Sequence, residues 1–112
     1  MATDLTAQAV HTANGTLTTN LAAKPKGGVT IQAGLGAGVT AAVVTIQGRI
    51  GASATKTTIA VITLPAPAGQ ANAGSPTDMV DIDAQLGLSF DSVVTGFAGA
   101  GNLFVDYEGL GL

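Results

Sequence analysis

The sequence contains no cysteine and no tryptophan, and each absence excludes some chemistry. A chain without cysteine forms no disulfide, no thiolate metal site and no thiolate nucleophile. Aromatic residues account for only 4% of the chain. Because ligand pockets are usually lined by hydrophobic and aromatic side chains, this scarcity argues against a sugar-binding cleft.

Charged residues are also scarce, at 10% of the chain, where about a quarter is usual. The net charge is −3, and the four cations are scattered: Lys24, Lys26, Arg49 and Lys56. Phosphate contacts need clustered cations, so we expect no nucleic-acid partner. The low charge has two explanations of equal weight: partners cover much of the surface, or uncharged polar side chains solubilise the domain alone.

Long hydrophobic runs are absent as well. No apolar run reaches the roughly 18 residues of a membrane-spanning helix. Residues 1–7 lack the basic and apolar regions of a signal peptide. We therefore expect no membrane partner and synthesis in a cytoplasm. At 112 residues the chain is expected to form one domain.

What the sequence does contain is alternation with a period of two, clearest in residues 40–51. Successive side chains of a strand point to opposite faces, so this stretch predicts one buried face and one wetted face. The buried face would carry Ala42, Val44, Ile46, Gly48 and Ile50, and the wetted face Val43, Thr45, Gln47 and Arg49.

Weaker versions of this pattern predict further strands over residues 16–23, 29–35, 57–64, 78–86, 90–97 and 103–108. About eight short strands without a helical pattern predict an all-β fold. We expect a single antiparallel β-sandwich, with jelly-roll-like or Ig-like connectivity. We expect the sandwich over residues 16–112 and a flexible or partner-ordered arm over residues 1–15, although Leu5, Ala7 and Ala9 also allow an edge strand there.

Two segments suggest contacts with other molecules. Residues 57–64 are apolar on both faces, which indicates either a central strand or one that packs against a neighbouring subunit. Residues 65–76 form a long connection without periodicity, and such loops are usually functional or mobile. The contact candidates are Leu5, His11, Arg49, Ile59, Val61, Pro65, Pro67 and Phe104.

The sequence shows no catalytic constellation, so we expect no enzyme and no cofactor. Gly34, Gly36 and Gly38 are spaced unlike a phosphate loop and precede a strand, so a hairpin loop is favoured there. His11 is interpreted as a surface histidine, and residues 98–102 as a hairpin turn. Asp78, Asp81 and Asp83 are candidates for a calcium site, but an outer strand face kept soluble by like charges is favoured.

Three segments resemble small β-sandwich proteins of tailed-phage virions, including capsid decoration (cement) proteins. The resemblance lies in Val44–Gly51, Phe90–Phe97 and Gly99–Gly109, and it covers roughly residues 28–109. It implies a structural virion protein on the capsid surface, made in the host cytoplasm. Its partners would be the major capsid protein and itself, as a homotrimer.

The sequence also leaves three other functions open. One is a tail or head–tail accessory protein of the same particle. Another is a secreted adhesin or carbohydrate-binding module. The third is a small hydrolase built on the aspartate cluster, whose two strand carboxylates resemble a glycosidase pair.

Overall fold

The computed structural model describes residues 3–20, 27–50, 55–84 and 88–111. Within these ranges the chain is all-β, as expected, with eight strands and no helix. The strands are β1 (Thr3–His11), β2 (Gly15–Thr19), β3 (Gly27–Leu35), β4 (Val39–Ile50), β5 (Thr57–Leu64), β6 (Thr77–Ala84), β7 (Leu88–Gly99) and β8 (Leu103–Gly111). Among the described residues no helix is long and apolar enough to cross a membrane.

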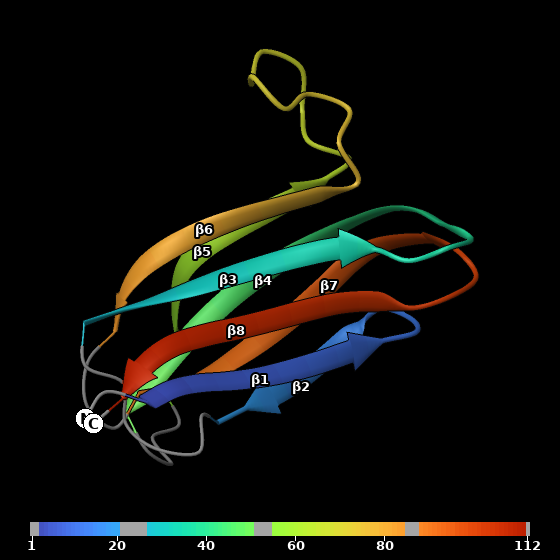
Figure 1. Cartoon of the computed structure of the whole chain (residues 1–112). Coiled ribbons are helices and arrows are strands. Elements are labelled where there is room, and N and C mark those ends of the chain that lie inside the picture. Colours follow the sequence, from blue (N-terminus) through green and yellow to red (C-terminus); the bar gives the residue numbers. More distant parts are fainter. Residues whose placement is uncertain (1–2, 21–26, 51–54, 85–87, 112) are drawn as a thin grey trace.

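The strands form two antiparallel sheets that pack face to face (Figure 1). The first sheet has the order β1-β8-β3-β6 and the second sheet the order β2-β7-β4-β5. In sequence terms β1 pairs with β8, β2 with β7, β3 with β6 and β4 with β5. This is one long hairpin rolled up on itself, so of the two connectivities that the sequence allowed, the structure has the jelly roll.

The N-terminal segment belongs to the sandwich. Residues 3–11 pair with β8 without interruption, from Thr3 opposite Gly111 to His11 opposite Leu103. Over residues 3–11 the structure therefore shows the edge strand that the sequence allowed here, in place of a flexible arm.

The core lies between the two sheets and follows the predicted alternation. In β4 the residues Ala42, Val44 and Ile46 are buried, while their neighbours on the other face are half-buried. In β7 and β8 the rings of Phe90 and Tyr107 meet with their centroids 5.7 Å apart. The remaining buried apolar residues of this core include Ala9, Val29, Ile31, Ala33, Ile62, Leu64, Val94, Leu103 and Val105.

Two glycine-containing turns join the sheets at one end, which corrects the predicted hairpins at residues 34–38 and 98–102. Each connects strands of different sheets, β3 to β4 and β7 to β8. The turns touch through their backbones, because the amide of Ala100 donates to the carbonyl oxygen of Gly38 at 3.0 Å. Gly38 and Gly99 have φ angles of 88° and 95°, and a Cβ atom on either would collide with the facing turn.

β5 is an edge strand, not the central strand that its two apolar faces suggested. It pairs only with β4, and its outward side chains Ile59 and Val61 are 36% and 55% exposed. The edge position excludes the central strand, and packing against a neighbouring subunit stays a prediction.

The opposite faces of β4 allow a matched test of the core. Val44→Ala removes buried methyl groups and should lower the free energy of unfolding by about 2 kcal/mol. The same substitution at the half-buried neighbour, Val43→Ala, should cost less than about 1 kcal/mol. Chemical denaturation of both variants measures the difference, and equal losses would contradict the assignment of faces.

Candidate functional site

Four of the eight predicted contact residues lie together at one edge of the molecule. Ile59 and Val61 are on β5, and Pro65 and Pro67 follow directly where this strand ends. All four are exposed. We refer to β5 together with the loop of residues 65–76 as the β5 edge region.

The loop is held by its own backbone hydrogen bonds and stands away from the sandwich (Figure 1). At its base Ala66 is buried, and its amide donates to the carbonyl oxygen of Ser75 at 2.9 Å. The amide of Gly74 donates back to the carbonyl oxygen of Ala66 at 2.8 Å. Residues 67–74 beyond this base are exposed, so the loop presents a shaped surface to other molecules.

His11 is buried, which corrects its interpretation as a surface histidine and removes it from the contact candidates. It is 4% exposed, and its Nε2 atom lies 2.8 Å from Oγ of Ser92 on β7. Which of these two atoms donates depends on the tautomer of the imidazole. Oγ of Ser92 also lies 3.4 Å from the backbone carbonyl oxygen of Leu17. This pair joins β1 of the first sheet to β7 and β2 of the second.

The serine–histidine pair has the residue types of a nucleophile and its base, but its surroundings are those of a core. Ser92 is fully buried. The hydroxyl of Tyr107 comes close to Ser92 and Thr19 without a hydrogen bond of regular geometry. Burial raises the pKa of Tyr107, and the charge of Asp91 adds to this rise, while Ser92 and Thr19 oppose it.

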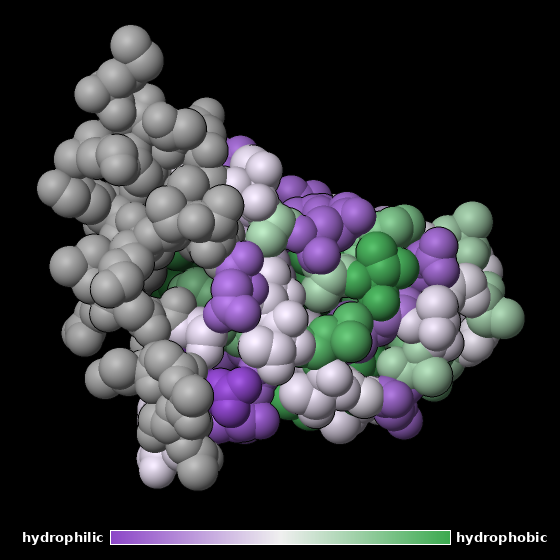
Figure 2. Space-filling view, turned by 90° about the horizontal axis from the view of Figure 1, so that it is seen from below, coloured by the Kyte–Doolittle hydropathy of each residue, from purple (hydrophilic) through white to green (hydrophobic). Residues whose placement is uncertain are grey.

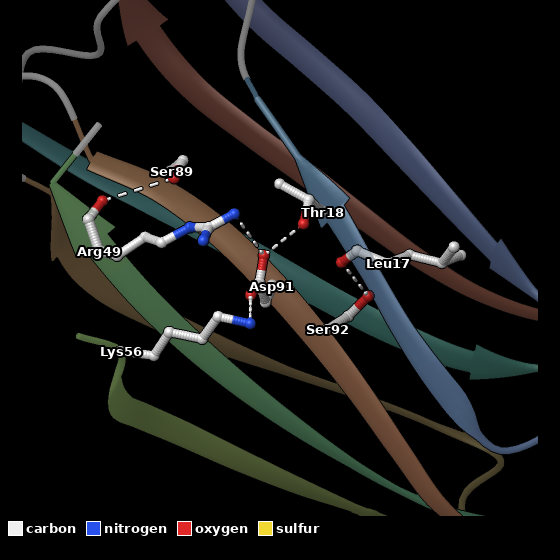
Figure 3. Close-up of polar contacts among 7 residues, drawn as sticks. All are labelled: Leu17, Thr18, Arg49, Lys56, Ser89, Asp91 and Ser92. Carbon is white, nitrogen blue, oxygen red and sulfur yellow. Dashed lines mark hydrogen bonds and ion pairs between the residues drawn. The ribbon is translucent and has the colours of Figure 1, made fainter. Parts of the chain in front are cut away.

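The side chain of Arg49 lies on the outer face of the second sheet, where it forms an ion pair with the buried carboxylate of Asp91 (Figure 3). Nη2 of Arg49 is 3.9 Å from Oδ1 of Asp91, and Nζ of Lys56 is 2.6 Å from Oδ2. The hydroxyl of Thr18 donates to Oδ1 at 2.7 Å. The Asp91 side chain is only 1% exposed, so the two long cationic side chains cover it.

The electrostatics of this cluster favour the charged carboxylate. Burial alone would raise the pKa of Asp91. The hydrogen bonds from Lys56 and Thr18, and the positive charges of Lys56 and Arg49, outweigh burial and hold the pKa below its ordinary value. The sequence did not single out Asp91, since its partners come from three distant segments.

The other candidates are dispersed. Phe104 is half-buried on the outer face of the first sheet. Leu5 pairs through its backbone with Gly109, and its side chain lies outside the described residues. The described part of the chain contains no group of three acidic or histidine side chains placed to bind a metal. Oδ1 of Asp81 accepts a hydrogen bond from the Thr30 hydroxyl at 2.6 Å, and Oδ1 of Asp78 accepts one from the Asn72 amide at 3.1 Å. The side chain of Asp83 lies outside the described residues.

The described residues also line hollows elsewhere on the surface. A shallow groove of about 620 Å³ runs over the outer face of the first sheet, lined by Gln8, Thr30, Gln32, Asp106 and Glu108 among others. A smaller hollow of about 200 Å³ lies at the turn between β1 and β2. Figure 2 shows the molecule from the side of β1 and β2, where hydrophobic side chains lie among polar ones. The exposed large apolar residues of β1 and β2 are Val10 and Leu17.

The buried histidine predicts a pH-dependent stability. Burial lowers the pKa of His11 below its ordinary value of 6.5. As the pH falls below 6.5, the unfolded chain binds a proton that the folded chain does not, so the protein should lose stability between pH 7 and pH 5, by at most about 1.4 kcal/mol per pH unit. His11→Gln should remove this dependence, which urea denaturation at several pH values would measure. An unchanged slope in the variant would contradict the assignment.

Comparisons of the chain with protein-family models, with curated proteins and with solved structures gave no match.

Proposed function

We propose that this protein is a structural protein of a phage particle, which binds the outside of the capsid across junctions between capsid subunits. The observation that carries the proposal is the β5 edge region. There an uncharged strand with exposed apolar side chains is continuous with an ordered loop that projects from a rigid sandwich.

The surface of the second sheet supports an adhesive role. Apart from the cluster around Asp91, the described outward residues of its strands are uncharged, and most are threonine or valine. In register across the sheet they form the row Thr16, Val93, Thr45 and Val61 and the row Thr95, Val43 and Thr63. A stiff face of β-branched side chains loses little side-chain entropy on contact, which favours many weak sites acting together.

The fold agrees with this proposal but does not select it. Jelly-roll sandwiches occur in viral capsid proteins and in lectins, so architecture alone does not assign the function. The capsid proposal is supported by the resemblance of residues 28–109 to virion β-sandwich proteins and by the exposed β5 edge region.

Electron microscopy tests the proposal. Heads produced without this protein should lack a layer of outer density, and adding the purified protein should restore it. A variant with residues 67–73 replaced by a Gly-Ser linker of equal length keeps the base of the loop and should bind at least about tenfold more weakly, because the projecting surface is lost. Met79→Ser, which changes an exposed apolar residue of the first sheet, is the control. An unchanged outer shell without the protein would contradict the proposal, and density on the tail would assign it to the accessory proteins there.

The groove on the first sheet favours a second candidate, binding of a hydroxyl-rich ligand such as a sugar. Its amide, hydroxyl and carboxylate side chains are hydrogen-bonding partners for sugar hydroxyls. Nε2 of Gln8 already donates to Oδ1 of Asp106 at 2.6 Å, which holds both side chains in place.

A glycan array tests the second candidate. Binding that falls about tenfold in Glu108→Gln, through loss of a charged acceptor, would support it. Absence of binding across the array would contradict it and would leave the capsid proposal untouched.

A further inference from the structure

We propose that β5 pairs with β5 of a second copy of this chain, antiparallel across a two-fold axis, so that two second sheets become one continuous sheet. β5 ends its sheet, with β4 as its one neighbour. An edge strand directs the N–H and C=O groups of alternate residues away from its sheet, and these groups can form a ladder with another strand.

The charges on the four edge strands single out β5. Natural proteins protect edges with charged side chains or by keeping the edge strand short. β1 contains Asp4, and β6 contains three aspartates. β2 is only five residues long, whereas β5 has eight residues and no charge. β2 and β5 are the two uncharged edge strands in the described part of the chain, and β5 is the longer of them.

The composition of β5 also fits pairing with itself. Its sequence, Thr-Thr-Ile-Ala-Val-Ile-Thr-Leu, has high β propensity and contains neither proline nor glycine. β6 of each copy belongs to the other sheet and takes no part in this ladder. Pairing through β6 instead would place the like charges of its aspartates directly opposite one another.

The geometry of β5 sets the register. Residue pairing with β4 passes from Ala60 opposite Ile46 to Thr58 opposite Gln47, so Ile59 is the extra residue of a β-bulge. The regular stretch is therefore Ala60–Leu64. An axis through Ile62 pairs all five residues and places Val61 opposite Thr63 of the second copy, on the outer face. Both side chains are exposed in the single chain.

The pairing changes what the molecule presents to a capsid. The outer face of the second sheet, uncharged apart from the cluster around Asp91, doubles in width. The two 65–76 loops come to opposite ends of the joined sheet because the β5 strands are antiparallel. Such a plate reaches two neighbouring capsid subunits at once. The pairing itself is argued only from the properties of β5, while its use in binding a capsid rests on the proposed function. It gives two copies, in place of the trimer that the resemblance implies.

Light scattering coupled to size exclusion, on the purified full-length protein without capsids, tests the pairing. The wild-type chain should shift from one copy to two as its concentration rises. Val61→Lys and Thr63→Glu should each weaken dimerisation at least about tenfold, because a charge is then placed in the joined sheet. Met79→Lys is the matched control, since Met79 on β6 is 56% exposed and Val61 55%, and it should leave dimerisation unchanged.

Mixing the two charged variants gives the sharpest outcome. In the stated register the lysine of one copy lies opposite the glutamate of the other, so the mixture should form dimers that neither variant forms alone. Circular dichroism and thermal unfolding confirm that each variant is folded. A wild-type protein that stays monomeric, or forms trimers, overturns the pairing, as does a dimer that all three variants retain. A dimer that does not bind capsids would contradict only the proposed function.

Discussion

One layer of side chains, shared by two sheets, is the constraint on which the rest of this structure depends. Val44 and Ile46 of β4, Phe90 of β7 and Tyr107 of β8 are buried in it because every second residue of each strand points inward. A slip of one residue in any ladder would turn that strand's apolar set toward water, so burial and register support each other. Most paired strands are far apart in sequence, as β1 and β8 are, so the layer is complete only when the whole chain has rolled up.

Two consecutive residues of β7 hold polar groups on opposite sides of the second sheet. Asp91 points outward and joins β2, β4 and the segment before β5 through Thr18, Arg49 and Lys56. Ser92 points inward and joins β1 and β2 through His11 and the carbonyl oxygen of Leu17. A buried carboxylate without partners would cost several kcal/mol (order of magnitude), so the cations that cover Asp91 are required by its burial. Arg49 and His11 therefore have structural roles in the sandwich.

Period-two patterning was enough to predict the sandwich, seven of its strands and the two faces of β4, where the side chain of Ile50 lies outside the described residues. It left residues 1–15 open between an arm and an edge strand. It failed where the answer depends on which strands become neighbours. Residues 57–64 carry apolar side chains on both faces whether they lie at a centre or at an edge, and only the sheet order shows that β5 is an edge. His11 was misassigned because its partner Ser92 lies 81 residues away. Asp91 alternates like a solvated residue, and no local signal in the sequence indicates that two distant cations cover it. The turns at Gly38 and Gly99 were recognised as turns, but local sequence does not say that they cross between sheets.

The two sheets differ in the charge that they expose to other molecules. The first sheet has charged edges, and Asp81, Asp106 and Glu108 lie on its strands. The second sheet has uncharged edges, and the charges of its outer face are gathered around Asp91. In a chain with a net charge of −3, like-charge repulsion disfavours contact between two first sheets and leaves the second sheet as the surface that approaches other molecules at least cost. A weak contact repeated over a regular lattice needs a surface of this kind: stiff, uncharged and wide enough to touch more than one subunit. Joining two copies through β5 supplies that width without a larger domain, because effective concentration then strengthens the second contact once the first has formed.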